Sequence, residues 1–312
     1  MGLSNSPFRV IVVGLGVQGQ KRRKFSGNDY IFGVDPNGTE AKYKDIFDVP
    51  LDQFDAALVC TPDASKVNII QYLLSNKKHV LVEKPLMASS EELASLQNVA
   101  NKNHLYCYTA YNHRFEPNFI RMRDLVKSGK LGKIYRCRMF YGNGTARLVR
   151  DSAWRDLGAG VLPDLGSHLL DTLNFWFDVH PEGIKVVSAS CYENKAFDHV
   201  VINSNEGEPK VELEMTLLMW RNHFTCDILA ERGTAHIESL CKWGPSKFIY
   251  RERQLPSGRP IERQEVLTCD DPTWEAEYRN FRANCIAKKE TNLKTDIWIG
   301  QTLNRLANES FE

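Results

Sequence analysis

The first third of the chain alternates short apolar runs with stretches that have a helical period. The apolar runs predict five buried strands at residues 8–13, 30–34, 56–60, 79–82 and 105–109. Between them, residues 18–25 and 66–76 predict helices, and Ser89 or Ser90 can cap another helix that has acids in its first turn. Strands and helices that alternate in this way predict a parallel, doubly wound sheet.

From about residue 113 the pattern changes, and strands with one buried face dominate. Helical patterns cover residues 118–127, about 164–177, 274–287 and 296–309. Strand patterns cover residues 133–141, 211–217 and 223–230, with a hairpin turn at 231–233 and further strands from residue 184 onward. The hydrophilic stretch 251–264 predicts a solvated loop or hairpin. Such a run of strands with helices to one side predicts an antiparallel α+β layer.

Composition narrows the class of protein. A chain of 312 residues allows two domains that each bury a core, and a net charge of +1 gives no electrostatic case for binding nucleic acid or an anionic membrane. No stretch approaches the roughly 20 apolar residues of a membrane span, and the first residues lack a secretory pattern. The eight cysteines are scattered without a CxxC pair. We therefore expect reduced thiols, no metal site and a cytoplasmic protein.

A glycine-rich turn follows the first predicted strand. Gly14, Gly16 and Gly19 form a G-x-G-x-x-G pattern between that strand and a helix. In a dinucleotide site the first glycine permits the tight turn, the second lets the backbone approach a diphosphate, and the third allows close helix packing. The diphosphate would lie at the helix N-terminus, where N–H groups and the helix dipole favour negative charge. The alternative is a turn that serves packing alone.

An acid lies where the second strand ends. Asp35 is 21 positions after Gly14, and a carboxylate there can accept hydrogen bonds from an adenosine ribose and repel a 2′-phosphate. This favours NAD over NADP. Arg22 and Arg23 stand against that interpretation, because a nearby arginine can favour a phosphate.

Charged residues also follow a later strand. Glu83-Lys84-Pro85 comes directly after residues 79–82, and Thr61-Pro62 follows the strand at 56–60. A charged pair is costly in a core, so we expect Glu83 and Lys84 at the mouth of the sheet, where ligands of open α/β sheets bind. On the tripeptide alone, a surface lysine after a strand is an equal alternative.

With these motifs the chain resembles the Gfo/Idh/MocA oxidoreductases, which include glucose–fructose oxidoreductase and inositol 2-dehydrogenase. The resemblance runs nearly end to end and rests on the glycine turn, Thr61-Pro62, Glu83-Lys84-Pro85, Asn112-His-Arg114-Phe115, Trp154-Arg155 and the stretch 158–171 with Asp164-x-x-x-His168. It implies a Rossmann domain at 1–112 and an α+β domain with an open-faced, mostly antiparallel sheet at 113–292, which binds substrate and oligomerises. The helix at 296–309 is expected to pack back on the Rossmann domain.

The chain departs from the family pattern at two positions. Lys66 stands where members commonly carry histidine, and Pro163 precedes the aspartate of the D-x-x-x-H motif. Neither departure removes a proton-transfer group, and proline suits a first helical turn.

Oxidation of a secondary alcohol needs a hydride acceptor, a base for the hydroxyl proton and a group that orients both. His168 is the candidate base because imidazole titrates near neutral pH. Asp164, four residues earlier on the same helical face, can contact a second hydroxyl or steady His168. Lys84 can stabilise a developing alkoxide. The family assigns matching roles to these residues, with a division of labour that varies among members; without the resemblance, the Asp/His pair could be a helix cap and a surface histidine.

Two sets of binding residues follow from the motifs and the resemblance. The predicted cofactor-binding residues are Gly14, Gly16, Val17, Gln18, Gly19, Asp35, Thr61, Pro62, Glu83 and Lys84. The predicted substrate-binding residues are Asn112, Arg114, Tyr141, Trp154, Arg155, Asp164 and His168. Two alternatives stay open: Arg114 can bind a substrate anion or form an interdomain salt bridge, and Trp154 can stack on a sugar or pack in the core.

The leading hypothesis is an NAD-dependent dehydrogenase that acts on a secondary hydroxyl of a sugar, polyol or nucleotide-linked sugar. The alternatives are a glycoside hydrolase that uses NAD transiently and a non-catalytic regulator that binds a dinucleotide. We also expect a homodimer or homotetramer formed through the open sheet, because an exposed apolar face is a liability in a monomer. The residues expected to supply both a buried face and a partner face are Leu213, Met215, Leu217, Phe224, Cys226 and Ile228.

Overall fold

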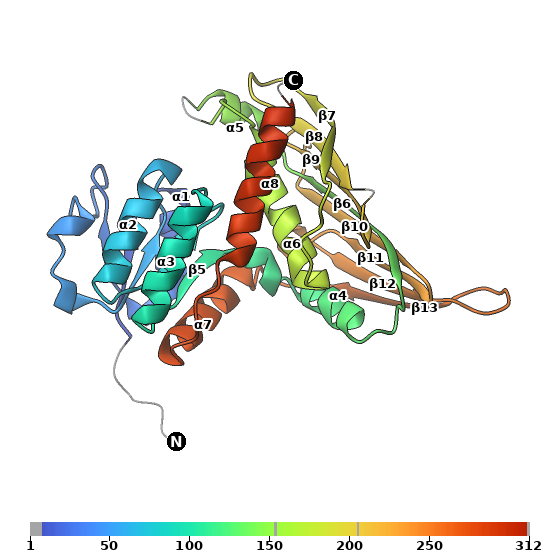
Figure 1. Cartoon of the computed structure of the whole chain (residues 1–312), viewed down its shortest axis with the longest axis horizontal. Helices are drawn as coiled ribbons and strands as arrows, with labels where there is room; N and C mark the ends of the chain where they lie inside the picture. The colour runs from blue at the N-terminus through green and yellow to red at the C-terminus, as the bar shows by residue number, and fades with distance from the viewer. Residues whose placement is uncertain (1–7, 153–154, 205, 311–312) are drawn as a thin grey trace. The chain divides into compact units, whose positions relative to one another are not determined.

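The computed structural model describes residues 8–152, 155–204 and 206–310, which divide into two compact units (Figure 1). Unit 1 comprises Met1–Asn112 and Thr273–Gly300, and unit 2 comprises His113–Pro272 and Gln301–Glu312. The predicted combination of a doubly wound parallel sheet and a mostly antiparallel sheet is confirmed.

Unit 1 follows the strand–helix alternation that its sequence predicts. Its strands are β1 (Val10–Val13), β2 (Tyr30–Val34), β3 (Ala56–Val59), β4 (His79–Glu83) and β5 (Cys107–Ala110). Its helices are α1 (Val17–Ser26), α2 (Asp63–Ser75), α3 (Ser90–Lys102), α7 (Thr273–Ile286) and the first part of α8 (Lys294–Ser310), which continues into unit 2. Ser89 caps α3 in a capping box with Glu92, as the serine and the acids of the first turn predict.

The five strands of unit 1 are all parallel, in the order β2-β1-β3-β4-β5. Their residues are buried on both faces, which explains the continuous apolar runs in the sequence. One face packs on α2 and α3 through residues such as Ile11, Val80, Ile70 and Leu93. The polar residues that follow β1, β3 and β4 therefore lie at the same edge of the sheet, because parallel strands share their carboxyl ends.

Unit 2 contains an eight-stranded mixed sheet in the order β13-β12-β11-β10-β6-β9-β8-β7, in which only the β6–β9 pair is parallel. Its strands are β6 (Ile134–Gly142), β7 (Lys185–Ser190), β8 (His199–Ser204), β9 (Lys210–Thr216), β10 (His223–Ala230), β11 (Gly233–Glu238), β12 (Ser246–Glu252) and β13 (Ile261–Leu267). Its helices are α4 (Pro117–Lys127), α5 (Ala146–Arg150), α6 (Ser167–Phe177) and the end of α8. The hydrophilic stretch 251–264 forms the β12–β13 hairpin.

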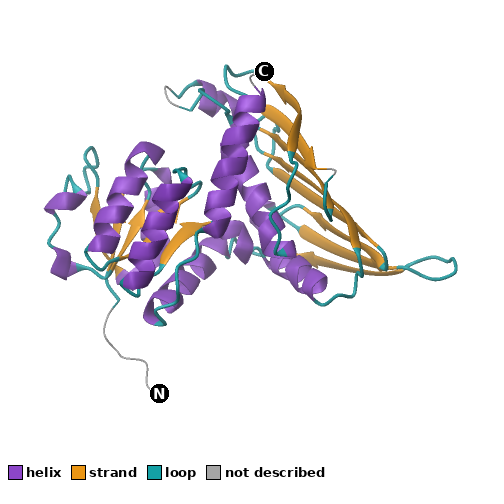
Figure 2. Ribbon diagram, in the orientation of Figure 1, coloured by secondary structure: helices purple, strands orange, loops and turns teal. Residues whose placement is uncertain are grey.

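Helices lie against one face of this sheet, among them α4 and α6 (Figure 2). The indole N–H of Trp176 on α6 donates to the carbonyl of Phe119 on α4 over 3.0 Å, and both side chains are fully buried. The ring of Phe119 lies 4.9 Å from that of Phe224 on β10, so aromatic packing joins the two helices to the sheet.

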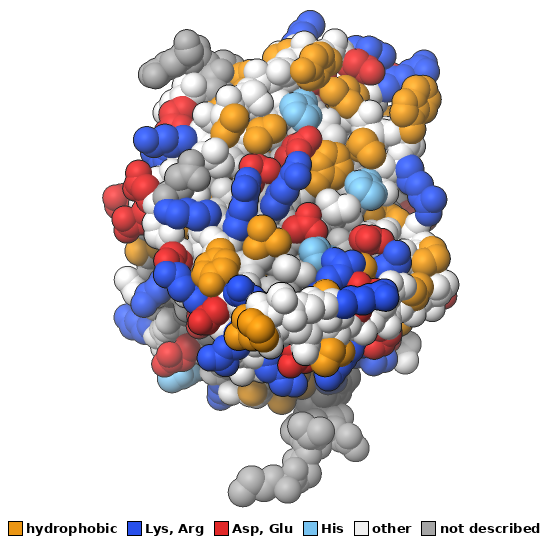
Figure 3. All heavy atoms as spheres, turned by 90° about the vertical axis from the view of Figure 1, so that its right-hand side faces the viewer, with side chains coloured by type: hydrophobic (Ala, Val, Ile, Leu, Met, Phe, Trp, Pro, Cys, Tyr) orange, Lys and Arg blue, Asp and Glu red, His pale blue; other side chains and the backbone are white. Residues whose placement is uncertain are grey.

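The other face of the sheet is open and charged. Along β9, Leu213 and Met215 are buried, whereas Glu212 and Glu214 point outward and pair with arginines of β6. Figure 3 shows positive, negative and hydrophobic side chains interspersed on this side of the molecule.

The expectation that a set of six apolar residues in the predicted strands also supplies a face for a partner subunit is wrong. The members of that set, Leu213, Met215, Leu217, Phe224, Cys226 and Ile228, are all buried. Strand alternation directs them to a single side.

His79, the first residue of β4, is held neutral by its surroundings. Its Nδ1 accepts the backbone N–H of Tyr106 over 2.9 Å, which a protonated Nδ1 cannot do. Burial lowers the pKa of His79 to about 4; the Asp55 carboxylate opposes this, and Lys288 and Lys78 reinforce it. In the unfolded chain the same ring has its ordinary pKa of 6.5.

We expect this histidine to make folding weaker in acid. Between about pH 6.5 and about pH 4 the unfolded chain binds a proton that the folded chain does not, so the free energy of unfolding falls as pH drops, by about 2 to 3 kcal/mol. Urea unfolding from pH 7.5 to pH about 4.5 measures this fall. In His79→Asn the amide oxygen can accept the same N–H without titrating. That variant should lack this part of the pH dependence, and equal slopes in both proteins would contradict the assignment.

Candidate active site

The glycine turn joins β1 to α1 as predicted. Gly14 has φ +90°, and a Cβ there would lie 2.7 Å from the carbonyl oxygen of Cys60. A Cβ on Gly19 would lie 1.9 Å from the Gly14 carbonyl oxygen, so both positions exclude any side chain. Gly16 differs, because a Cβ there would meet no described atom within 4 Å. The packing of the fold therefore does not require a glycine here, and the space beside Gly16 is open.

The N-terminus of α1 fits a diphosphate. Gly16 is its N-cap residue, no side chain caps it, and its first turn carries no acid. Val17 and Gln18 follow as the first helical residues and are exposed. The helix dipole and the N–H groups of this turn are thus open to a negative charge.

Asp35 is fixed beside this turn as a carboxylate. Its Oδ2 accepts the N–H of Leu15 over 2.7 Å, and its Oδ1 accepts the N–H groups of Asn37 and Gly38 over 2.8 and 2.7 Å. Burial alone would raise its pKa, but these three donors and nearby Lys44 lower the pKa below the ordinary value. Asp35 therefore keeps a negative charge next to the predicted ribose position.

The two arginines of α1 are already paired. Arg22 is 2% exposed; its Nε lies 2.6 Å from Glu83 and its Nη1 lies 2.6 Å from Glu277. Burial opposes its charge, but the two carboxylates hold the pKa of Arg22 above its ordinary value. Arg23 forms an ion pair with Glu40. Both guanidinium groups are thus engaged by carboxylates, and Glu83, predicted to bind cofactor, has its carboxylate on Arg22.

The segment after β4 carries Lys84, which is half-buried. Thr61 and Pro62 follow β3, and Pro62 is the N-cap residue of α2. The ammonium of Lys66, on α2, donates to the carbonyl oxygens of Glu83 and Pro85, the neighbours of Lys84. The sequence marked Lys66 only as a departure from the family pattern and missed this contact.

In unit 2, His168 lies among aromatic rings. It is buried on α6, its ring stacks on His113 with centroids 4.1 Å apart, and the Tyr141 ring lies 6.1 Å away. Burial and, to a smaller degree, the charge of Asp164 raise the pKa of Tyr141. Tyr141 is therefore brought close to Asp164 and His168, the two residues of the D-x-x-x-H motif, in this unit.

The backbone around Asp164 differs from the predicted regular helix. Leu162–Gly166 forms a π-helical turn, and α6 begins at Ser167. Gly166 lies against the sheet, where a Cβ would be 3.0 Å from the sulfur of Met215. The Asp164 carboxylate is 3.7 Å from Arg155, and both side chains are about one-third exposed, so this ion pair is weak. π-Turns of this kind often occur at functional sites.

Two predicted substrate-binding residues have partners within their own units. Arg114 forms a two-pronged ion pair with Asp171, over 2.9 Å from Nε and 2.5 Å from Nη2. Burial raises the pKa of Asp171, and Arg114 opposes that rise. The amide of Asn112 donates to the Thr273 hydroxyl over 2.8 Å. Trp154, also predicted to bind substrate, lies outside the described residues.

A short segment that the sequence did not single out adjoins this cluster. Lys242 Nζ lies 3.2 Å from His113 Nε2, and an ammonium can only donate, so His113 carries its proton on Nδ1. The ring of Trp243 lies 5.7 Å from that of Tyr141. These residues are about 100 positions from Tyr141 in sequence, and no local pattern indicates their approach.

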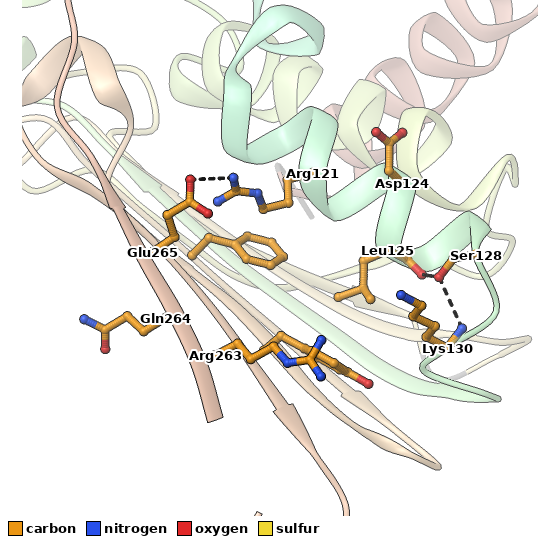
Figure 4. A pocket seen from close by; sticks show the side chains of 10 residues that line it. Arg121, Asp124, Leu125, Ser128, Lys130, Arg263, Gln264 and Glu265 are labelled. Atoms are coloured by element: carbon orange, nitrogen blue, oxygen red, sulfur yellow. Dashed lines mark hydrogen bonds and ion pairs between the residues drawn. The ribbon is translucent and has the colours of Figure 1, made fainter. Parts of the chain in front are cut away.

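A separate hollow of about 390 Å³ lies between α4 and the β12–β13 hairpin (Figure 4). It is lined by Arg121, Asp124, Leu125, Ser128, Lys130, Phe248, Tyr250, Arg263, Gln264 and Glu265. Its charges are mixed, and Arg121 and Glu265 pair with each other. It contains none of the predicted site residues.

Among the described residues, no group of three or more His, Cys, Asp or Glu side chains is arranged to hold a metal ion. The helices of the same residues are too short or too polar to span a membrane.

Parts of the chain are similar in sequence to known dehydrogenases. The chain is 31% identical over 97 residues to myo-inositol 2-dehydrogenase of Thermotoga maritima, covering 31% of this chain and 29% of that protein. It is 27% identical over 120 residues to a scyllo-inositol 2-dehydrogenase (NADP+) of Bacillus subtilis, covering 38% and 33%. The matched stretches thus span about a third of the curated relatives' length.

Structural similarity extends over nearly the whole chain. Levoglucosan dehydrogenase in complex with NADH superposes with a TM-score of 0.81, covering 97% of each chain at 14% identity, which shows a shared fold.

The family descriptions match both parts of the chain in order. Residues 8–111 match "Oxidoreductase family, NAD-binding Rossmann fold", and residues 119–236 match "GFO/IDH/MocA C-terminal domain". With a glycine turn that fits a dinucleotide in one unit and an eight-stranded sheet in the other, the chain belongs to the Gfo/Idh/MocA oxidoreductase family and has its NAD(P)-binding Rossmann fold.

Proposed function

We propose that this protein is an NAD-dependent oxidoreductase that transfers hydride between the nicotinamide and a secondary hydroxyl of a sugar, polyol or nucleotide-linked sugar. The observation that carries the proposal is the cluster of His168, Tyr141 and Asp164 in the unit that matches the family's C-terminal domain. The inositol dehydrogenases among its relatives support a polyhydroxylated substrate.

The residues of unit 1 fit the cofactor. The open N-terminus of α1 would hold the diphosphate, and Asp35 would accept hydrogen bonds from the adenosine ribose. When bound, the nicotinamide accepts a hydride from the carbinol carbon. The hydroxyl must then lose a proton to a protein group, and the product is a carbonyl compound.

Three side chains would act on the substrate: one would take the proton, and two would bind its oxygen atoms. His168 takes it from the hydroxyl as a general base, and its burial among aromatic rings excludes water from the imidazole. The ammonium of Lys84 donates a hydrogen bond to the same oxygen and stabilises its negative charge. Asp164, about one-third exposed beside Arg155, binds a neighbouring hydroxyl and so selects a diol-like substrate.

Removal of either proton-transfer group should slow the chemical step. We expect Lys84→Met and His168→Gln to lower kcat by about 10² to 10⁴ fold, and His168→Gln to leave the Kd for NADH nearly unchanged. The measurement is NADH absorbance against a panel of polyols, sugars and nucleotide sugars, with exposed His104→Gln as the matched control. Parent-like turnover in both variants would contradict the assignment, and aglycone release without net NADH would indicate the hydrolase alternative.

The preference for NAD rests on charge at the ribose end. Asp35 is anionic and would repel a 2′-phosphate, and Arg22 and Arg23 are both bound to carboxylates. The relatives do not decide the matter, because one is named for NADP+ and a similar structure holds NADH. The paired arginines weaken the interpretation in which they favour NADP.

Neutralising Asp35 should shift this preference. In Asp35→Asn an amide oxygen can still accept the Leu15 N–H, but the charge is gone, so the ratio of kcat/KM for NADP to that for NAD should rise at least about tenfold. Steady-state kinetics with both cofactors measures the ratio. Asp45→Asn is the matched control, because Asp45 likewise accepts a backbone N–H at the start of a helical turn. A parent protein that already prefers NADP would contradict the proposal.

We also propose that the open face of the unit 2 sheet pairs with a second copy. Its side chains alternate in sign: Glu212 lies 2.5 Å from Arg136 and 2.9 Å from Arg138, and Asp227 lies 2.6 Å from His236. A face that carries both signs can match itself across a two-fold axis. The partner face is thus polar rather than apolar.

We expect a dimer or tetramer at micromolar concentration by light scattering. Arg138 lies on β6, inside the sheet, so Arg138→Glu places acids together and should shift the protein toward monomer. Lys185→Glu, on the edge strand β7, is the control and should leave the mass unchanged. A monodisperse parent monomer would refute the interface.

A further inference from the structure

Within the described part of unit 1, Lys66 carries a buried ammonium whose donors find acceptors. The residue is 2% exposed, and an ammonium has three N–H donors. Its Nζ lies 2.7 Å from the Glu83 carbonyl oxygen, 2.9 Å from the Pro85 carbonyl oxygen and 2.7 Å from a carboxylate oxygen of Asp63. Each donor therefore has an acceptor, which makes the burial of this charge tolerable.

The acceptors connect two segments of the sheet edge. Asp63 opens α2, directly after Thr61 and Pro62, whereas the two carbonyls belong to Glu83, the last residue of β4, and to Pro85 just after it. If the two segments moved apart, the buried ammonium would lose acceptors, which is costly. Lys66 therefore holds the segments at a fixed separation.

Lys84 lies between the two carbonyls that Lys66 holds. The residue before it is fixed twice, because the Glu83 carbonyl bonds Lys66 and the Glu83 carboxylate bonds Arg22. The residue after it is fixed at the Pro85 carbonyl. With the backbone held on both sides, the direction in which the Lys84 side chain leaves the chain is set as well.

We propose that Lys66 is a positioning residue that orients Lys84 for hydride transfer. The inference rests on the proposed function, in which Lys84 contacts the reacting oxygen. It assigns a role to the position at which the chain departs from the family pattern: an ammonium with three donors can hold two carbonyls and a carboxylate at once. An error of about 1 Å in the placement of a catalytic group can cost about a hundredfold in rate.

The test compares Lys66→Met with a matched lysine in the same unit. Lys78 Nζ also donates to a backbone carbonyl, that of Phe54, over 2.8 Å, but it precedes β4 and so lies at the opposite end of that strand from Lys84. Both substitutions remove one ammonium and keep an unbranched side chain of similar length. Lys66→His retains an N–H donor and the residue that the family commonly carries there.

We expect Lys66→Met to lower kcat by about 10 to 100 fold while the Kd for NADH, measured by fluorescence titration, stays within about threefold. Lys66→His should fall between Met and the parent, and Lys78→Met should keep the parent kcat. In the cofactor-free protein, amide hydrogen exchange of the peptide that contains Lys84 should accelerate by about tenfold in Lys66→Met and not in Lys78→Met.

Two results would overturn the inference. One is a parent-like kcat in both Lys66 variants, or in Lys66→His if Lys66→Met does not fold. The other is equal effects of Lys66→Met and Lys78→Met on kcat, which would show general destabilisation. Lys84→Met, assayed in parallel, distinguishes a failure of the positioning role of Lys66 from a failure of the proposed function. If it abolishes turnover and Lys66→Met does not, only the positioning role fails; if it turns over normally, the proposed function fails and the positioning role fails with it.

Discussion

The arrangement at the edge of the Rossmann sheet depends on one constraint, which is that a buried charge must find a partner. Arg22 satisfies it with Glu83 and Glu277, and Lys66 satisfies it with Asp63 and two carbonyls. Both sets of contacts converge on the end of β4, at Glu83 and Pro85. The carboxylate of Glu83 neutralises an arginine of the first helix, and the backbone on either side of Lys84 is fixed as a result.

The second unit achieves order by a different means. Strand alternation divides its sheet into a face under α4 and α6 and a face of alternating charges, and the aromatic rings of the covered side continue into the surroundings of His168. His113 lies next to the candidate base: its ring stacks on His168, and its Nε2 accepts a hydrogen bond from Lys242. The imidazole proposed as the base is therefore held by packing rather than by a loop, which suits a group whose position must be reproducible.

Local signals account for what the sequence predicted well. Apolar runs gave the strands, Ser89 and Glu92 gave a capped helix, and the glycine spacing gave the turn at α1. Contacts between distant positions account for what it missed. Glu277 lies 255 residues from Arg22, Trp243 reaches Tyr141 from the turn between β11 and β12, and the π-turn at Leu162–Gly166 forms where Gly166 packs on Met215. No periodicity in the chain encodes these approaches, because each depends on the completed fold.

The edge of the larger sheet shows a constraint that is unrelated to catalysis. β13 is one of the two edge strands of this sheet, and its residues are exposed almost throughout. An edge strand has unpaired N–H and C=O groups that can hydrogen-bond to a strand of another molecule, which can lead to aggregation. Its centre, Glu262-Arg-Gln-Glu265, is charged or polar, which discourages such stacking. We therefore expect substitutions in this segment to be tolerated as long as its charged side chains are kept, because those charges protect the solubility of the protein.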